Sequence, residues 1–450
     1  MGRLFGTDGA RGVAITELTC ETAMNIGRAA ALVLTKTTNR KPKILIGKDT
    51  RISGDVLEAA LIAGICSVGA DAHVLGVVPT PAVAMLVKKY EADAGVMISA
   101  SHNPVEFNGI KLFSGSGFKL PDAIENEIEE LVLDNPESIC LSSGSLIGRV
   151  IYEKNAQWDY IRYIMKNIEG DLRGIKVCID CANGASSECA EKLFKGLGAS
   201  CVFINNKPDG TNINKECGST HMDKLCKATV DNKCHIGIAF DGDADRCLAC
   251  DENGNIIDGD KLLAIFSKYM KAAGKLKSNC CVVTVMTNLG FFKFAKESGV
   301  LVATTQVGDR YVLEEMQNGG YNLGGEQSGH IIFLDEATTG DGELTAAKLL
   351  EIMAKTHAKA SELASVMTSY PQVLKNVKIS ADKKGKWKLD EEVLGAIDTY
   401  KAKLGDDGRI LIRESGTEPL VRVMIEGKNF GVITEYAQNI VNVIEKFAAK

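Results

Sequence analysis

The chain has 450 residues, of which 45% are hydrophobic, and its formal net charge at pH 7 is −6. This length and composition predict a globular protein of about two to four domains. No stretch concentrates Lys and Arg, so the sequence offers no electrostatic surface for nucleic acid. No apolar run approaches the roughly 18 residues of a membrane span, and the first residues lack a signal-peptide core. We therefore expect a cytoplasmic protein that binds neither nucleic acid nor membrane.

A strand–helix–strand pattern occurs three times along the chain. In the first copy Ser53 is the expected N-cap of the helix, and Leu57, Leu61, Ile65 and Val68 recur at the spacing of a buried helical face. Three such units predict three α/β layers. The three copies span residues 43–76, 175–204 and 280–305.

The last 80 or so residues have a different pattern, a hairpin over residues 409–427 followed by a terminal helix. This predicts a fourth, smaller α+β domain. The expected fold is therefore α/β, with three similar α/β domains and an α+β C-terminal domain. We place the domains at residues 1–152, 153–254, 255–368 and 369–450.

The stretch "DGDADR" places Asp241, Asp243 and Asp245 directly after an apolar strand. In an extended chain the three side chains share one face, with neighbours roughly 7 Å apart, and such like charges favour a bound cation. Carboxylate ligands favour a hard ion such as Mg²⁺. An EF-hand loop is disfavoured because Arg246 stands where that loop requires Gly; a solvated turn is the other alternative. Arg246 also favours an anionic ligand beside the metal.

The stretch "RESGTEPLVR" is typical of a phosphate-binding loop. Ser415, Gly416 and Thr417 offer backbone N–H groups and hydroxyls, and Arg413 and Arg422 offer bidentate charge. A plain hairpin turn that needs Gly is the alternative interpretation.

Two further Gly-rich stretches carry polar side chains. "GGEQSGHIIF" brings Glu326, Ser328 and His330 together on a turn, a group that suits a polyhydroxylated ligand. In "FGTDGARG" the glycines permit close backbone approach and Arg11 can reach an anion, although a flexible terminus explains this stretch almost as well.

Ser101 and His102 lie in "SASHNP", at the end of an apolar strand pattern. A hydrolase nucleophile is disfavoured, because G-x-S-x-G is missing and the side chain of an adjacent His normally points elsewhere. The hydroxyl is better interpreted as a phosphoryl carrier assisted by a cation. Asn108-Gly109 predicts a hairpin turn that folds Lys111 back as a candidate proton donor or acceptor.

In this order and over this length, "SASHNP", "DGDADR", "GEQSGH" and "RESGTEP" resemble the α-D-phosphohexomutases, and "FGTDGARG", "FNGIKL", "VGDRYV" and "TTGDG" agree. The resemblance implies four domains around a central cleft. It implies a phosphoserine at Ser101, with Mg²⁺ held by its phosphate and the three aspartates. It places Arg11, His102, Lys111 and Arg246 at the phosphoryl-transfer site, with Lys111 as the acid/base. Glu326 and Ser328 would bind sugar hydroxyls, with His330 nearby, and the loop with Arg413, Ser415, Gly416, Thr417 and Arg422 would hold the non-reacting phosphate.

The resemblance also implies a substrate. Gln327 and the whole-chain likeness favour interconversion of glucosamine 6-phosphate and glucosamine 1-phosphate, with glucosamine 1,6-bisphosphate as intermediate and activator. Activity on mannose or glucose phosphates is the alternative within the family; a magnesium-dependent phosphatase and a sugar-phosphate-binding protein without turnover are alternatives from other classes. We expect a small sugar phosphate as the partner and a monomer or homodimer.

Overall fold

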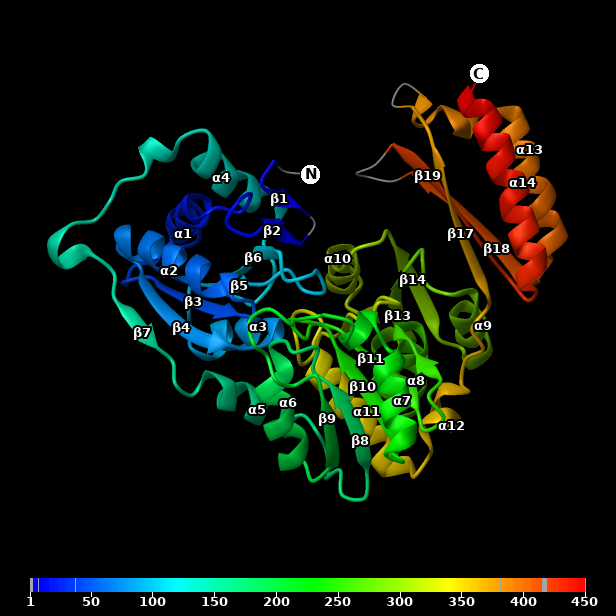
Figure 1. Cartoon of the computed structure of the whole chain (residues 1–450), viewed down its shortest axis with the longest axis horizontal. Helices are drawn as coiled ribbons and strands as arrows, with labels where there is room; N and C mark the ends of the chain where they lie inside the picture. Colours follow the sequence, from blue (N-terminus) through cyan, green and yellow to red (C-terminus); the bar gives the residue numbers. More distant parts are fainter. Residues whose placement is uncertain (1–2, 7, 37, 381–382, 415–418, 450) are drawn as a thin grey trace. The chain divides into compact units, whose positions relative to one another are not determined.

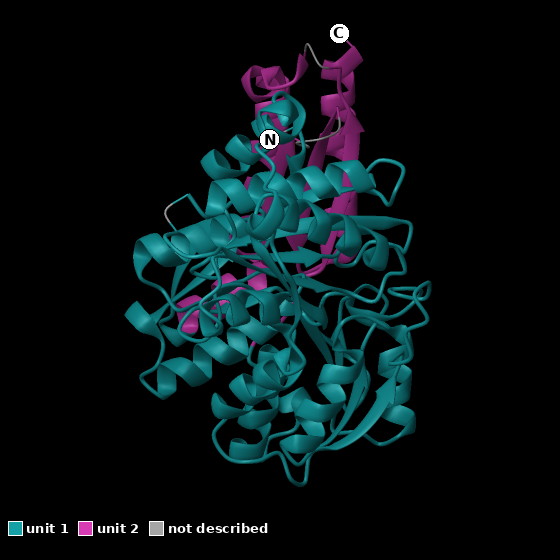
Figure 2. Cartoon of the chain, turned by 90° about the vertical axis from the view of Figure 1, so that its left-hand side faces the viewer, with its two compact units in different colours: residues 1–286, 298–366 teal, residues 287–297, 367–450 magenta. Residues whose placement is uncertain are grey.

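The computed structural model describes residues 3–6, 8–36, 38–380, 383–414 and 419–449. The chain divides into two compact units (Figure 2), one made of residues 1–286 and 298–366 and the other of residues 287–297 and 367–450. No helix within the described residues is long and apolar enough to cross a membrane.

The first sheet of the larger unit has seven strands in the order β1-β2-β6-β5-β3-β4-β7 (Figure 1). Strand β3 pairs in parallel with β4 and β5, whereas β6 runs antiparallel to β5, so the sheet is mixed. Its strands are β1 (Phe5–Gly6), β2 (Gly9–Val13), β3 (Lys43–Lys48), β4 (Asp71–Val77), β5 (Ala94–Ile98), β6 (Phe107–Ser114) and β7 (Val150–Tyr152), and its helices are α1 (Cys20–Leu34), α2 (Ser53–Ser67), α3 (Thr80–Lys89) and α4 (Asp122–Leu133).

Helices cover both faces of this sheet, which explains the continuous apolar run of β3. Ile44 and Ile46 pack into one core with α1, α2 and α4. Leu45, whose side chain points to the opposite face, is equally buried, and α3 packs on the strands β3 and β5. The predicted stripe of α2 is confirmed for Leu57, Leu61 and Ile65, which are fully buried, whereas Val68 is the C-cap and is only partly buried. Ser53, however, is the first residue of α2, and Ile52 occupies the N-cap.

The same unit contains two further mixed sheets, in the strand orders β12-β11-β10-β8-β9 and β14-β13-β15-β16. The strand pairs β8/β9 and β13/β14 are parallel, as the repeated pattern predicted. The second sheet comprises β8 (Lys176–Asp180), β9 (Ser200–Ile204), β10 (Ile236–Phe240), β11 (Cys247–Asp251) and β12 (Ile256–Ile257), with helices α5 (Ala156–Lys166), α6 (Ser186–Gly196) and α7 (Asp223–Asp231). The third comprises β13 (Cys280–Thr284), β14 (Leu301–Thr305), β15 (Leu323–Gly325) and β16 (Ile331–Phe333), with helices α8 (Gly259–Ala272), α10 (Asp309–Gly319), α11 (Gly342–Thr356) and α12 (Ala360–Ala364).

The smaller unit is built on an antiparallel sheet in the order β17-β19-β18. The predicted C-terminal hairpin and terminal helix are both present. Val421, Val423 and Ile425 alternate along β19 and pack with the apolar side of the last helix. The elements are α9 (Leu289–Ser298), β17 (Gln372–Lys378), α13 (Glu391–Leu404), β18 (Gly408–Glu414), β19 (Leu420–Gly427) and α14 (Phe430–Ala449). The chain is thus an α/β protein with a smaller α+β C-terminal part.

Candidate active site

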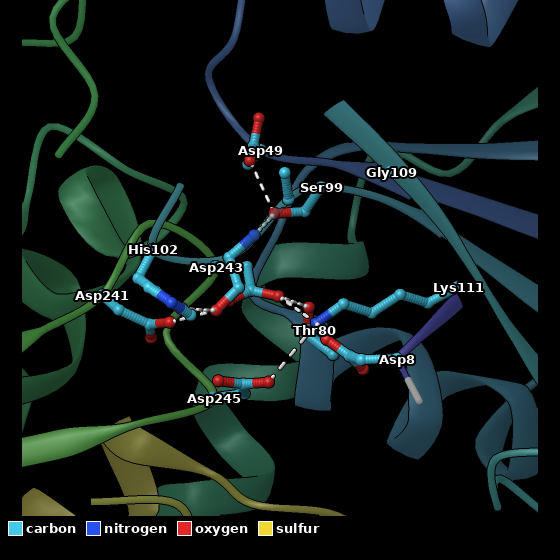
Figure 3. A network of polar contacts seen from close by, with 12 residues as sticks. Asp8, Asp49, Thr80, Ser99, His102, Gly109, Lys111, Asp241, Asp243 and Asp245 are labelled. Atoms are coloured by element: carbon cyan, nitrogen blue, oxygen red, sulfur yellow. Dashed lines mark hydrogen bonds and ion pairs between the residues drawn. The ribbon is translucent and has the colours of Figure 1, made fainter. Parts of the chain in front are cut away.

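The three aspartates of "DGDADR" form one cluster in the loop between β10 and β11 (Figure 3). One carboxylate oxygen from each of Asp241, Asp243 and Asp245 lies within 4.8 Å of the others, and all three side chains are buried. The extended geometry expected from the sequence is wrong. Strand β10 ends at Phe240, and Ala244 has a left-handed backbone with φ of 56°, so a tight turn brings the carboxylates together.

Unpaired oxygen atoms in this cluster fit a bound cation. Among the described residues, neither Asp243 Oδ1 nor Asp245 Oδ1 has a hydrogen-bond partner, although both atoms are buried. A buried acceptor without a partner costs free energy, and a divalent ion would remove that cost. Burial and the charges of Asp245 and Asp243 raise the pKa of Asp241 well above its ordinary value. The donor set, three carboxylates, matches Mg²⁺.

Ser101 lies beside this cluster, in the loop between β5 and β6. Its Oγ donates to Asp241 Oδ2 at 2.6 Å, and its backbone N donates to Ser99 Oγ at 2.9 Å. The residue is buried and has φ of 52°, a left-handed conformation that is unfavourable for serine. The loop therefore holds a serine hydroxyl against a potential metal ligand.

His102 lies closer to the hydroxyl than the sequence predicted. Its Nδ1 is 3.3 Å from Ser101 Oγ and 3.1 Å from Arg246 Nη1. A guanidinium group can only donate, so Nδ1 must accept and the proton of the neutral ring lies on Nε2. Burial, together with the charges of Arg246 and Arg11, lowers the pKa of His102 to about 4. His102 is therefore neutral near pH 7.

Lys111 reaches the aspartate cluster from β6, where it pairs with Met97 of β5. Its Nζ lies 2.8 Å from Asp243 Oδ2, 3.1 Å from Asp8 Oδ2 and 3.4 Å from Asp245 Oδ2. Burial alone would lower the pKa of this fully enclosed amine, but the charges of the three carboxylates outweigh it and raise the pKa well above its ordinary value. Lys111 is a buried ammonium group.

The predicted hairpin turn at Asn108-Gly109 is wrong, because both residues lie inside β6. The chain reverses before them, between Ile98 and Phe107. A Cβ atom on Gly109 would come within 2.5 Å of the Ser99 carbonyl oxygen. The glycine is thus explained by a close backbone approach rather than by a turn.

Two arginines contact the Ser101 loop. Arg11, on β2, donates to the Ala100 carbonyl oxygen at 3.3 Å and forms an ion pair with Asp8. Arg246 follows the aspartate cluster and contacts His102, while its Nε is buried and has no hydrogen-bond partner within the described residues. Both guanidinium groups can bind an anion next to Ser101.

The "GEQSGH" residues lie in the turn between β15 and β16. Glu326 accepts a hydrogen bond from the Gly308 N–H at 3.1 Å, and burial raises the pKa of its carboxyl group. Ser328 Oγ is buried and has no partner among the described residues, which leaves it available to a ligand hydroxyl. His330 is buried with Nδ1 3.7 Å from Asp245 Oδ2, and its Nε2 accepts from the Gly340 N–H at 3.0 Å. Nδ1 of His330 thus faces the aspartate cluster.

In the smaller unit, Arg413 and Arg422 are direct cross-strand partners on β18 and β19. Burial and the charge of Arg422 lower the pKa of Arg413. Two guanidinium groups at facing strand positions can bind one anion together. Ser415, Gly416 and Thr417 lie outside the described residues.

Family models cover nearly the whole chain. The phosphoglucomutase/phosphomannomutase α/β/α domains I, II and III match residues 2–138, 158–254 and 258–370, and the C-terminal domain of the same family matches residues 374–443. The chain belongs to the phosphoglucomutase/phosphomannomutase family.

Curated relatives of this phosphohexomutase are similar over their full length. The chain is 55% identical over 446 residues to the phosphoglucosamine mutase of Acetivibrio thermocellus, with 99% of each chain covered. It is 53% identical over 448 residues to the phosphoglucosamine mutase of Clostridium acetobutylicum, with 100% of each chain covered.

Solved structures share the fold at low sequence identity. A phosphoglucomutase/phosphomannomutase family protein from Burkholderia thailandensis matches with a TM-score of 0.81 and 23% identity, covering 98% of this chain and 97% of its own. The Aspergillus fumigatus N-acetylphosphoglucosamine mutase in complex with GlcNAc-6P and magnesium matches with a TM-score of 0.68 and 17% identity, covering 99% and 96%. These matches support the fold.

Sequence reasoning missed several partners in the site of this phosphohexomutase. Thr80, the first residue of α3, donates to Asp243 from both Oγ1, at 2.6 Å to Oδ2, and its backbone N, at 2.9 Å to the carbonyl oxygen. Lys119 joins Asp8 to Asp309, and Asp309 Oδ2 lies 3.6 Å from His330 Nε2. Asp8 and Asp309 stand in the recognised stretches "FGTDGARG" and "VGDRYV", which was the only available signal.

The stretch "TTGDG" supports the metal loop through its glycines. Gly342 N donates to the Ala244 carbonyl oxygen at 2.9 Å, and a Cβ atom on Gly342 would come within 2.4 Å of the Arg246 carbonyl oxygen. Replacing Gly342 with alanine must therefore displace the loop that carries Asp243 and Asp245. The role of Gly342 is to support the loop that carries the proposed metal ligands.

We predict that Gly342→Ala weakens Mg²⁺ binding by about 10- to 100-fold, as is typical when the support of a metal ligand is disturbed. Isothermal titration calorimetry with MgCl₂ measures this directly. Gly395→Ala is the matched control, because a Cβ atom there meets nothing within 4 Å. Wild-type Mg²⁺ affinity in Gly342→Ala would contradict the assignment.

Proposed function

We propose that the protein is a phosphoglucosamine mutase, an isomerase that interconverts glucosamine 6-phosphate and glucosamine 1-phosphate. The observation that carries the proposal is the buried Ser101 hydroxyl 2.6 Å from a carboxylate of a cluster that can bind a metal ion. The substrate assignment is supported by the names of relatives that are 53–56% identical over their full length.

In the proposed reaction Ser101 carries the phosphoryl group. The bond between phosphorus and Ser101 Oγ breaks as a new bond forms to a hydroxyl of the sugar phosphate, giving glucosamine 1,6-bisphosphate. As Ser101 Oγ leaves phosphorus it takes up a proton from the Lys111 ammonium group, and the proton of the sugar hydroxyl passes to the resulting Lys111 amine. The bisphosphate then reorients in the site and returns its other phosphate to Ser101. Added bisphosphate would accordingly act as an activator by phosphorylating resting enzyme.

The residues around Ser101 have distinct roles in this proposal. Asp241, Asp243 and Asp245 would hold Mg²⁺ together with the serine phosphate, and the ion would neutralise charge on the transferring group. Arg11 and Arg246 would bind its equatorial oxygens, beside His102. Lys111 holds a proton in the resting site, so it acts first as an acid and then, as the amine, as a base.

The remaining residues would hold the sugar phosphate. Glu326 and Ser328 would bind sugar hydroxyls, with His330 behind them. The loop with Arg413, Ser415, Gly416, Thr417 and Arg422 would bind the phosphate that is not reacting. The sugar phosphate is the proposed partner, and the cytoplasmic location and a monomer or homodimer stay predictions.

We predict that kcat/KM for glucosamine 6-phosphate exceeds that for mannose or glucose 6-phosphate by at least about 10-fold, because a polar contact that a substrate cannot make costs roughly 1 to 3 kcal/mol. The test is initial-rate measurement with each hexose 6-phosphate and a catalytic amount of the matching bisphosphate. Equal or reversed preference would instead assign the protein as a phosphomannomutase or phosphoglucomutase.

A further inference from the structure

The loop that presents Ser101 is closed around the side chain of Arg51. Arg51 follows β3, and its guanidinium group is fully buried with an equally buried ion-pair partner, Asp49. Its Nε donates to Asp49 Oδ2 at 2.9 Å. The four remaining N–H groups point to backbone carbonyl oxygens of the loop, those of Ser101 at 3.0 Å, Asn103 at 2.8 Å, Phe107 at 3.1 Å, and Pro104. All five donors of the side chain are thus used.

A second residue, Asn214 in the loop between β9 and α7, contacts two of the same carbonyl groups. Asn214 Nδ2 donates to the Ser101 carbonyl oxygen at 2.8 Å and to the Asn103 carbonyl oxygen at 3.0 Å. Asp49 also accepts from Ser99 Oγ, the atom that in turn accepts from Ser101 N (Figure 3 shows the pair Asp49 and Ser99). The backbone on both sides of Ser101 is therefore fixed from two directions.

This arrangement explains how Ser101 keeps an unfavourable conformation. A non-glycine residue with φ of 52° persists only where its surroundings determine it, and here the carbonyl group of Ser101 itself receives bonds from both Arg51 and Asn214. Turning Ser101 back to an ordinary φ would move that carbonyl away from both donors. It would also move Oγ away from Asp241.

We propose that Arg51, together with Asn214, is a positioning residue for phosphoryl transfer: the two side chains hold the Ser101 loop in the left-handed turn that aims Oγ at the aspartate cluster. The catalytic meaning of this inference rests on the proposed function. A lysine cannot replace Arg51. A single ammonium group cannot contact all five acceptors that surround the planar guanidinium group.

The test compares two variants with two matched controls. Arg51→Lys keeps the charge but loses the fork, and Asn214→Asp keeps the shape and the tolerance for a left-handed backbone but loses both donated bonds. Arg28→Lys controls for the first change, since the hydrogen bonds of the Arg28 side chain within the described residues go to Ser67 and Asn25 and not to the Ser101 loop. Asn183→Asp controls for the second, since Asn183 is as buried as Asn214 and also left-handed but does not bond to the Ser101 loop.

We expect kcat to fall about 100-fold in Arg51→Lys and Asn214→Asp, because a small displacement of a reacting group has an effect of this size. KM for the sugar phosphate should change less than about 3-fold. Hydrogen exchange measured by mass spectrometry should show faster exchange in peptides covering residues 99–107 in both variants. The two controls should match wild type in kcat and in exchange. A purely structural role would lower the melting temperature without separating kcat from KM.

Wild-type kcat in Asn214→Asp, or unchanged exchange over residues 99–107, would overturn the proposal. If Arg51→Lys fails to fold, Asn214→Asp decides alone. The proposed function fails separately: wild-type protein without mutase turnover would remove the phosphoserine chemistry, whereas the exchange measurement would still test whether Arg51 and Asn214 fix the loop.

Discussion

Ser101→Ala is expected to lower mutase turnover by several orders of magnitude while leaving a folded protein. The variant loses the hydroxyl that carries the phosphoryl group, and added glucosamine 1,6-bisphosphate cannot restore activity because no oxygen is left to accept the phosphate. The lost hydrogen bond to Asp241 costs only about 1 kcal/mol of stability. Coupled assays of glucosamine 1-phosphate formation and thermal unfolding measure the two effects.

The control for Ser101→Ala is Ser278→Ala, because Ser278 has nearly the same left-handed φ, 54°, but is exposed. Its turnover should equal that of the wild type. Mass spectrometry of wild-type protein should find one added phosphate on the peptide that contains Ser101, and none on that peptide in Ser101→Ala. If Ser101→Ala keeps more than a few per cent of wild-type turnover, the phosphoserine mechanism is wrong.

Removing the metal ion or one of its proposed ligands is expected to have the second largest effect on turnover. EDTA should abolish turnover and Mg²⁺ restore it, and Asp243→Ala should be nearly inactive in saturating Mg²⁺. The reason is that Asp243 supplies an unpaired oxygen to the cluster and also accepts from Thr80 and Lys111. Mg²⁺ at 100 times its dissociation constant should stabilise the wild type by about 2.7 kcal/mol and leave Asp243→Ala unaffected.

Asp251→Asn is the matched control for the metal experiment. Asp251 is a buried carboxylate at the end of β11 that accepts hydrogen bonds from Asn253 and Asn255 and lies outside the aspartate cluster. This variant should keep the Mg²⁺ response of the wild type. Full activity of Asp243→Ala in EDTA would refute a metal site at this cluster.

The sequence predicts those parts of the site that lie in short, chemically unusual stretches. Asp241, Asp243 and Asp245 are three carboxylates within five residues, a pattern that favours a nearby cation, so a cluster able to bind a metal ion could be predicted. The parallel pairs β3/β4, β8/β9 and β13/β14 follow from apolar runs separated by one helical pattern. Local periodicity is sufficient for these elements.

What the sequence could not predict depends on backbone conformation. Asn108-Gly109 has the composition of a turn, but position 109 needs glycine because the Ser99 carbonyl oxygen lies too close for a Cβ atom. His102 Nδ1 lies 3.3 Å from Ser101 Oγ in a loop where Ser101 is left-handed, a conformation that no residue type in that stretch requires. Arg51 acts on carbonyl groups, which every residue possesses, so no spacing or motif identifies its partners.

The contacts at the aspartate cluster have a consequence for folding. Ser101 and Asp241 are 140 residues apart in the chain, and Thr80 and Asp243 are 163 apart, while Gly342, the first residue of α11, donates a hydrogen bond to the same loop. Such non-local contacts form late, after the loops between them have closed. A nascent chain that ends before residue 342 cannot yet hold its metal loop in place. Recovery of activity during refolding should therefore report the last step of assembly, well after the helices have formed.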